Sequence, residues 1–460
     1  MQNSSRTKCQ IFISSNLDIF KPQAMSIKSL IFLFILLITT GVFAWSVRRL
    51  VAYFRLTRPA FKVDRISERI KITLQVALGQ SKIFRLPIAG VLHALVFWGF
   101  LVITIGSIEM VIDGLLGTHR VLGILGVAYD IITASGDIFA YIVLFSILIF
   151  IVRRLFLSIH RFKGEEMKPV SKYDANLALS IIGLLMLSLI GMNIGYLGTG
   201  GMEGIYPISV ALTTWFAQGL DATQMHLFHE INWWAHILLI FLFANILPYS
   251  KHFHVFMSMP NVFLSRLEPL GYLPNMENVM QEVRLMMDPS APAPEPTGEV
   301  LRFGVKDVED SNWKNYADAL TCTECGRCTA VCPANITGKR LSPRKIFVDL
   351  RARMKEKGPG LIKEGRAYDD GKALLGDYVS AEELWACTTC NACALECPLN
   401  INHPTLILDM RRFLVMEEAA APSGLNSMFT NIENNGAPWQ YSPEDRLQWA
   451  ENLTMNNNAS

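Results

Sequence analysis

The chain has 460 residues and a formal net charge of +2, and its hydrophobic content of 51% is high for a soluble protein. The near-neutral balance gives no indication of nucleic-acid binding. Nine cysteines are present, and eight of them lie in two short motifs near the C-terminus. Only Cys9 is left over, which excludes a disulfide framework.

Five apolar stretches dominate the first 260 residues, and each is long enough to cross a bilayer, which takes about 20 residues as a helix. A single stretch of this kind could be a buried helix of a soluble protein. Five in succession predict an all-α transmembrane bundle. The stretches lie at about 29–47, 86–112, 131–152, 177–197 and 231–249.

Basic residues concentrate in alternate connections between these stretches. Ten Lys and Arg residues follow the first stretch and six follow the third. The second connection contains Arg120 alone, and residues 198–230 contain no Lys or Arg. Because positive loops stay in the cytoplasm, this pattern predicts an extracytoplasmic N-terminal tail at 1–28 and a cytoplasmic segment after the fifth span. The expected location is a bacterial or archaeal inner membrane.

The remaining boundaries follow from composition. A transmembrane domain is expected at 29–260 and a linker at 261–298, which is rich in proline at 288–298. A mainly helical cytoplasmic domain at 299–420 and a C-terminal extension at 421–460 would follow. Ser342 and Pro343 predict the start of a helix at 342–356, and a second helix is expected after Pro404.

Two copies of the pattern C-x-x-C-x-x-C-x-x-x-C-P carry the chemistry of the cytoplasmic domain. In two-cluster ferredoxins this spacing binds one [4Fe–4S] cluster through three cysteines and sends the fourth cysteine to the other cluster. The first cluster is therefore assigned to Cys322, Cys325, Cys328 and Cys397, and the second to Cys387, Cys390, Cys393 and Cys332. Two zinc sites are the alternative, although zinc usually takes two separated C-x-x-C arms.

Histidines within the spans are candidates for a cofactor, because ionisable residues in lipid are usually functional. At 1.5 Å per helical residue, His93 lies roughly 12 Å inside the cytoplasmic end of its span, and His236 lies roughly 27 Å above His254. Two axial ligands of one haem must share a level. His93 can therefore pair with His254, or with the adjacent His252, and not with His236.

The histidine spacing resembles the cytochrome b gamma subunit of respiratory nitrate reductase, a five-helix family with two b haems. His93, His236 and His254 match three of its four ligands, and the fourth position is Ile103. The resemblance implies a haem b between His93 and His254 and a possible second haem at His236. A replacement for the missing ligand would have to come from His119, His226 or His229 in the outer loops.

The second half resembles the small iron–sulfur protein of heterodisulfide reductase (heterodisulfide reductase C). It is still more similar to the membrane iron–sulfur subunit of electron-transfer-flavoprotein:menaquinone oxidoreductase. Long members of that last family carry CCG domains, and no cysteine follows Cys397 here, so that active site is expected to be absent. The resemblances cover most of residues 30–450. The matching stretches are Cys322-Thr-Glu-Cys-Gly-Arg-Cys, Thr337-Gly-Lys-Arg-Leu-Ser-Pro, Leu384-Trp-Ala-Cys-Thr-Thr-Cys and Gly436-Ala-Pro-Trp.

The expected function is a quinone-linked oxidoreductase subunit that passes electrons from a cytosolic partner, a CCG-domain protein or an electron-transfer flavoprotein, to menaquinone or ubiquinone. Glu109 and His236, at a similar depth, are candidates for the quinone site. The segment Gly436–Trp439 is a candidate docking face. The alternatives are a quinol-oxidising subunit that feeds a cytosolic heterodisulfide-type reductase, or a non-enzymatic membrane adaptor with structural metal.

Overall fold

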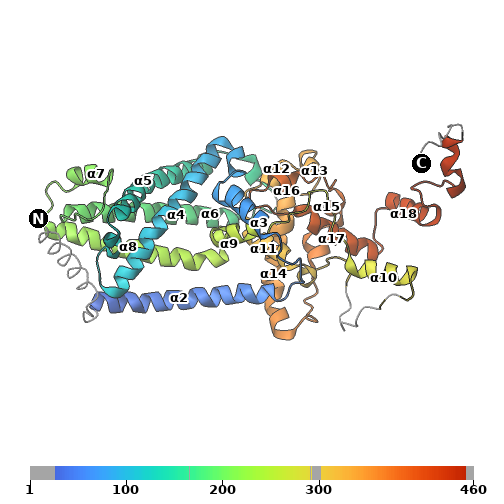
Figure 1. Ribbon diagram of the computed structural model, residues 1–460, viewed down its shortest axis with the longest axis horizontal. Coiled ribbons are helices and arrows are strands. Elements are labelled where there is room, and N and C mark those ends of the chain that lie inside the picture. Colours follow the sequence, from blue (N-terminus) through green and yellow to red (C-terminus); the bar gives the residue numbers. More distant parts are fainter. Residues whose placement is uncertain (1–25, 165, 291, 293–301, 452–460) are drawn as a thin grey trace, which may run out of the picture.

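The computed structural model describes residues 26–164, 166–290, 292 and 302–451. A bundle of long helices occupies one end of the molecule and a domain of shorter helices occupies the other (Figure 1). Within the described ranges the regular structure is helical, and the only β-structure is a pair of isolated bridges. This confirms the expected all-α fold.

Five helices are long and apolar enough to cross a membrane, as predicted. They extend beyond the apolar stretches because polar residues continue them past the hydrocarbon region. The clearest case is the last of them, which begins well before 231 because Asp221 and Gln224 form a capping box at its start. The five are α2 (Ile27–Phe54), α4 (Pro87–Leu116), α5 (Val127–Phe156), α6 (Pro169–Gly198) and α8 (Ala222–Ile246).

Helix α6 is the central element of the bundle and packs against α5, α8 and the short α7 (Ser209–Phe216). Helix α4 packs on α5, and α2 lies against α4 and α8. Close approach of α2 and α4 depends on Gly114, where a Cβ would lie 2.9 Å from the ring of the fully buried Phe32. The outward faces carry exposed apolar side chains, as expected of a surface in lipid.

The C-terminal domain is built round α14, which runs to Glu364 and is longer than the predicted 342–356. Ser342 accepts a hydrogen bond from the Lys345 amide, and Pro343 occupies the first turn. The helices of the C-terminal domain are α11 (Trp313–Thr321), α12 (Arg327–Ala330), α13 (Pro333–Ile336), α14 (Pro343–Glu364), α15 (Ala381–Trp385), α16 (Ala392–Glu396) and α17 (His403–Met416).

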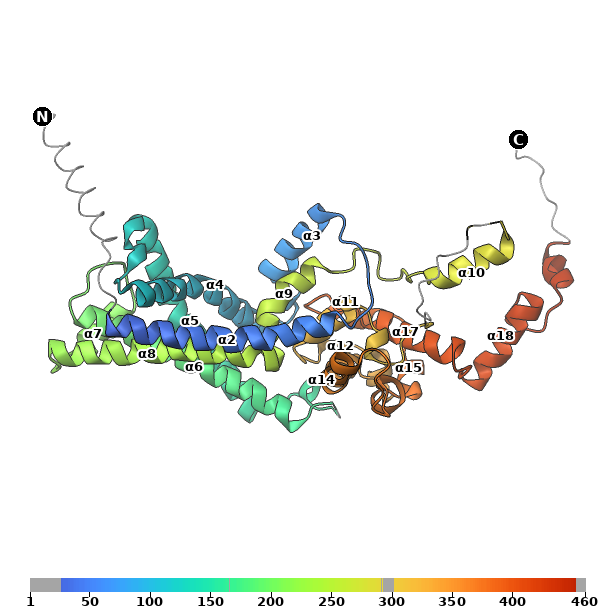
Figure 2. The ribbon, with the colours of Figure 1, turned by 90° about the horizontal axis from the view of Figure 1, so that it is seen from below.

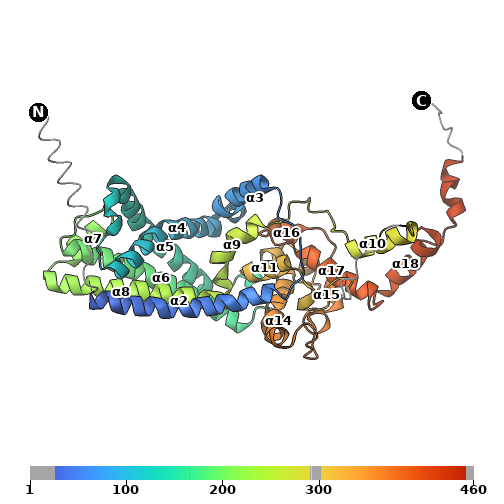
Figure 3. The same cartoon turned by 60° about the horizontal axis from the view of Figure 1, so that its bottom comes forward.

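The two halves share one apolar core. Leu50 and Tyr53 near the end of α2 belong to the same buried cluster as Leu350 and Met354 of α14. Gly358 of α14 permits this contact, because a Cβ there would lie 2.6 Å from the Tyr53 ring. Figures 2 and 3 show the junction from other sides, with the connecting helices α3 (Ile66–Ile72) and α9 (His254–Phe263) beside it.

The basic connections lie at this same junction. Arg58 forms an ion pair of 2.8 Å with Asp310, and its backbone bridges to Asn312 at the start of the C-terminal domain. The cysteine domain therefore sits at the end of the bundle that carries the positive loops.

Three elements stand away from both halves: α10 (Glu277–Met287), α18 (Ser423–Asn435) and the 3₁₀ segment Pro443–Ala450 (Figure 1). The candidate docking segment Gly436–Trp439 lies between α18 and the 3₁₀ segment, in the part of the chain after α17 that we call the arm, and Trp439 is 70% exposed. Most of the predicted N-terminal tail and of the proline-rich linker lies outside the described residues, and the domain boundaries stay predictions.

Candidate functional site

The eight motif cysteines are free thiols that fall into two neighbouring groups. One small void is lined by the three leading cysteines of the first motif together with the last cysteine of the second motif. The last cysteine of the second motif therefore lies with the three leading cysteines of the first motif, in the arrangement that the spacing predicts for one cluster. Site one denotes Cys322, Cys325, Cys328 and Cys397, and site two denotes Cys387, Cys390, Cys393 and Cys332.

Electrostatic contacts between thiols give the same partition. Burial raises the pKa of Cys397 to about 12, with a further contribution from the thiols of Cys325 and Cys322. Burial likewise raises the pKa of Cys393 to about 12, with contributions from Cys387 and Cys332. Bare thiols here would be neutral, and bound iron would hold them as thiolates.

Backbone geometry at both sites suits loops that wrap round a cluster. Gly326 adopts φ +74°, and Thr389 and Asn391 adopt φ +53° and +61°, so the chain turns sharply beside the cysteines. The Thr389 amide donates to the Cys387 sulfur at 3.4 Å. No three Cys, His, Asp or Glu side chains of the described segments converge on a single-ion site, whereas a cubane spreads its four thiolates more widely.

The sites differ in exposure. Cys322, Cys328 and Cys397 of site one are buried, whereas Cys390 of site two is exposed. The helices that carry the third cysteine of each motif, α12 and α16, pack together. Site two therefore reaches the surface, and site one lies behind it.

Histidine pairing at the cytoplasmic end follows the depth argument. Burial lowers the pKa of His254 to about 3, and the nearby rings of His252 and His93 lower it further. The ring of His93 thus lies within electrostatic range of His254. Nδ1 of His252 bonds to the Ser250 hydroxyl at 2.9 Å and lies 3.5 Å from an Asp174 carboxylate oxygen, which leaves its Nε2 for a ligand, so His252 stays the alternative ligand.

The two paired rings suit axial ligation. His93 Nδ1 is buried without a hydrogen-bond partner in the described chain. His254 Nδ1 faces the Lys251 carbonyl oxygen at 3.3 Å, which leaves Nε2 for a ligand. A histidine that ligates a metal usually donates its other ring N–H in this way.

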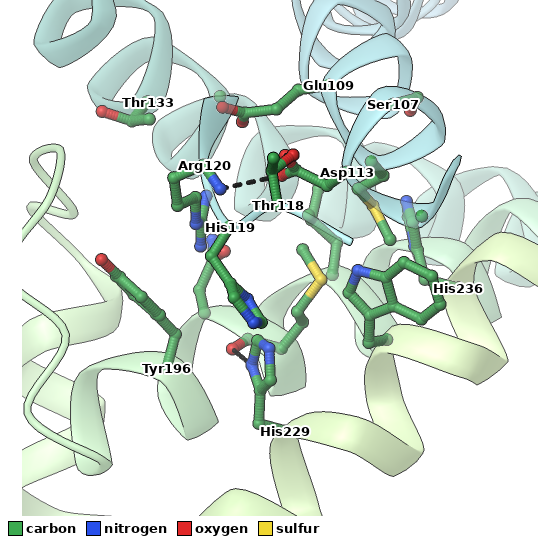
Figure 4. Close-up of a pocket in the computed structure, with 18 of the residues that line it drawn as sticks. Ser107, Glu109, Asp113, Thr118, His119, Arg120, Thr133, Tyr196, His229 and His236 are labelled. Carbon is green, nitrogen blue, oxygen red and sulfur yellow. Dashed lines mark hydrogen bonds between the residues drawn. The ribbon is translucent and has the colours of Figure 1, made fainter. Parts of the chain in front are cut away.

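A cavity of about 470 Å³ lies at the opposite end of the bundle from the cysteines (Figure 4). His236, 1% exposed, lines it, and its Nδ1 is held by the Leu185 carbonyl and the Ser188 hydroxyl, each at 3.0 Å. The other ring nitrogen has no hydrogen bond within the described segments. Ile103, the position of the missing fourth histidine, lines the same cavity.

The second quinone-site candidate also borders this cavity. Glu109 is 4% exposed, and its carboxylate accepts from the Leu122 amide at 3.0 Å and from the Tyr129 hydroxyl at 3.2 Å. His119, His226 and His229 from the outer segments line the cavity as well. The structure thus brings all these polar groups together. Both carboxylate oxygens of Glu109 already accept hydrogen bonds, from Leu122 and Tyr129.

Sequence reasoning missed the side chains that join the two halves. Glu166, in the connection after α5, forms a buried ion pair with Arg344 of α14 at 2.8 Å. Lys82, before α4, donates to the Cys397 carbonyl oxygen at 3.2 Å. Both residues belong to loops of ordinary charged composition, so no local signal distinguishes them.

Comparison with known protein families identifies the iron–sulfur region. The family described as 4Fe-4S dicluster domain matches residues 321–401. No solved structure matches the chain.

Relatives of similar layout cover nearly the whole chain. It is 28% identical to the probable iron-sulfur-binding oxidoreductase FadF of Bacillus subtilis, over 92% of this chain and 61% of the relative. It is 27% identical to the EtfAB:quinone oxidoreductase of Syntrophomonas wolfei, over 91% and 59%. The cysteine region alone, 23% of the chain, is 37% identical to a heterodisulfide reductase C protein of Methanosarcina acetivorans and covers 52% of it. The chain thus spans about 60% of the length of the two long relatives.

Proposed function

We propose that this chain is the membrane subunit of an oxidoreductase that passes electrons between a soluble redox partner and a membrane quinone. The observation that carries the proposal is the order of sites along the molecule. Exposed Cys390 belongs to site two, buried site one follows, the His93–His254 pair comes next, and the His236 cavity lies at the far end. Such an order is expected of a relay and has no purpose in an adaptor.

In this proposal the cysteines of sites one and two hold two [4Fe–4S] clusters, and His93 and His254 hold one haem b. When bound, these groups supply one-electron carriers whose potentials depend on charge and exposure. The resemblance to the nitrate reductase gamma subunit and the unpartnered Nδ1 of His93 support the haem. With Ile103 at the fourth ligand position, His236 is left without an opposite ligand from α4, which favours one haem.

The cavity at His236 is proposed as the quinone site. Because Nδ1–H of His236 donates to the Leu185 carbonyl oxygen, the other ring nitrogen of the neutral imidazole is an acceptor and can take a hydrogen bond from a quinol hydroxyl. Glu109 can exchange protons with the neighbouring Tyr129. Reduction of one quinone takes two electrons from the soluble partner, a reduced flavoprotein or iron–sulfur protein, and two protons, giving the quinol. The names of the long relatives, an iron-sulfur-binding oxidoreductase and an EtfAB:quinone oxidoreductase, support this assignment.

Orientation is part of the proposal. The positive loops contact the cysteine domain, so the positive-inside rule places that domain in the cytoplasm and the His236 cavity near the outer surface. A soluble partner, such as an electron-transfer flavoprotein or a CCG-domain protein, would then meet the exposed side of site two.

Two glycines offer a direct test. At Gly106 of α4 and Gly136 of α5, both lining the cavity, a Cβ would meet no atom within 4 Å. Gly106→Val and Gly136→Val therefore narrow the cavity, and the Cβ atom of neither variant meets a protein atom. We expect both to raise the quinone KM at least tenfold, or to abolish reduction, while the b-type absorbance and the iron content are retained.

Gly41→Val is the matched control, because Gly41 also has open space around its Cβ position but does not line the cavity. Quinone reduction is measured with the membrane complex and a soluble donor. Unchanged kinetics in both cavity variants would place the quinone elsewhere. Absence of b-type absorbance in the parent protein would contradict the haem.

A further inference from the structure

Two cations from the membrane half lie against site one. Lys82 precedes α4, and its Nζ donates to the Cys397 carbonyl oxygen at 3.2 Å. Arg161 lies in the connection after α5, and its guanidinium acts electrostatically on Cys325. Its backbone is pressed on the site-one loop, because a Cβ at Gly326 would lie 2.4 Å from the Arg161 carbonyl oxygen.

These two cations differ from the others near site one in having no carboxylate of their own. Arg344 pairs with Glu166, and Arg327 pairs with Glu396. Among the residues that the structure describes, neither Lys82 nor Arg161 forms an ion pair. Burial lowers the pKa of each cation, and the thiol of Cys397 or Cys325 acts in the opposite sense. Unpaired, half-buried cations beside four cysteines indicate that an anionic group belongs between them.

Site two has a different environment. Arg411 is the cation that acts on its cysteines; it donates to the Leu384 and Cys387 carbonyl oxygens and lies over the Trp385 ring. Cys390 is exposed, so water screens charges on that side. None of these Arg411 contacts comes from the membrane half.

This difference in nearby charge affects the direction of electron transfer between the two sites. An iron–sulfur cluster becomes one unit more negative when it accepts an electron, so a nearby cation favours the reduced form and raises the potential. Burial alone would disfavour the added charge at site one. Because Lys82 and Arg161 are held close and are not neutralised by a carboxylate of their own, their attraction opposes that effect.

We propose that Lys82 and Arg161 hold the potential of site one above that of site two, so that electrons run from the exposed site toward the membrane. This inference rests on the proposed function for its physiological meaning. Arg351 also reaches site one, at the Cys322 carbonyl oxygen, but it is paired with Glu324. Arg85 of the membrane half reaches α16 at the Leu395 carbonyl oxygen, but it is paired with Glu396 at 3.1 Å.

The test is an EPR redox titration of the anaerobically purified complex, in which Cys390→Ser identifies the site-two signal. Lys82→Gln keeps a donor for the Cys397 carbonyl but removes the charge, and Arg161→Gln does the same for its loop. Each variant is expected to lower the midpoint potential of site one. The distribution of an electron between the two sites should shift about tenfold toward site two, which corresponds to about 59 mV for one electron. Site two should keep its midpoint.

Lys82→Arg and Lys363→Met are the controls. Lys82→Arg retains the charge and should retain the parent midpoint. Lys363→Met removes a cation whose side chain is 82% exposed and that contacts neither site, so it should also leave the midpoint unchanged. A site-one midpoint that is unchanged in both Gln variants, or a parent site one lying below site two, would overturn the proposal. Loss of site-one iron in both Gln variants would also overturn it, since the cations would then hold the cluster rather than tune it.

The outcomes separate this inference from the proposed function. If the midpoints shift as expected but the complex reduces no quinone, the tuning role stands and the quinone assignment fails. If quinone is reduced by a parent protein in which site one lies below site two, the relay stands and the tuning role fails.

Discussion

Removing the charge of Glu166 should loosen the cysteine domain from the membrane half. Glu166 accepts from Arg344 Nε at 2.8 Å and from the Ser342 hydroxyl at 2.6 Å. Arg344 Nη2 also lies 2.8 Å from the same oxygen, although it is not aligned to donate. The side chains of the ion pair are 1% and 3% exposed, so Glu166→Gln leaves a buried guanidinium without its counter-charge.

The magnitude follows from that burial. Breaking a buried ion pair by removing one partner costs about 3–5 kcal/mol. At 1.4 kcal/mol per tenfold, the population with the 157–168 connection undocked should rise by about 100- to 4,000-fold. Arg344 keeps its hydrogen bond of 2.6 Å to the Arg161 carbonyl oxygen, so the lower end of this range is expected.

Proteolysis during a urea titration measures this opening. The connection contains Arg161 and Lys163 as trypsin sites, since Lys168 is followed by Pro169, and cleavage there is expected to increase when the connection leaves the domain. Glu382→Gln, a change of the same kind at an exposed position, is the control and should cleave as the parent does. Parent-like cleavage of Glu166→Gln at every urea concentration would show that the ion pair does not hold the two halves together.

Acid should reproduce the effect without mutation. Burial alone would raise the pKa of Glu166, but the Arg344 guanidinium and the Ser342 hydroxyl together hold it below its usual value of 4.5. A carboxylate whose pKa is lowered in the folded state contributes stability above its ordinary pKa and loses it as the pH falls through the folded value. Opening of the connection should therefore increase below about pH 4.5 in the parent and much less in Glu166→Gln.

Two further predictions concern the cofactors. The parent should contain about eight iron per chain, with Cys397→Ser chiefly damaging site one and Cys332→Ser chiefly damaging site two; iron analysis and EPR distinguish these, and two zinc per chain without iron would contradict both assignments. His254→Ala should abolish the b-type absorbance and His236→Ala should retain it; loss in His252→Ala instead would shift the ligand on the fifth helix by two residues.

The sequence was sufficient for features that depend on local pattern. Five apolar stretches predicted five candidate membrane helices, and the iron–sulfur region was recognised from its cysteine spacing. Helical rise alone placed His93 and His254 at one level, and the structure puts the two rings within electrostatic range of each other. Helix ends were less predictable, because the Asp221 capping box extends α8 through a polar segment that hydropathy does not mark.

Contacts between residues far apart in the chain could not be predicted from the sequence. Glu166 and Arg344 are separated by 178 positions, and nothing in either neighbourhood marks them as partners. Lys82 is one of many basic residues in its connection, and only the fold shows that it reaches Cys397. The docking role of Gly436–Trp439 stays a prediction, and the structure adds that Trp439 is exposed on the arm after α18.

The contrast between junction and arm bears on how such a relay works. Tyr53 and Met354 bury the junction in one core, and the Glu166 and Lys82 contacts tie the connections to site one. In the proposed relay these contacts would set the separation between site one and the His93–His254 pair. The arm after α17 carries exposed Trp439 and Trp449 instead, at 70% and 74%. On the same proposal, the buried junction would keep the spacing of the carriers constant, and the exposed aromatic residues of the arm would be available to a soluble partner.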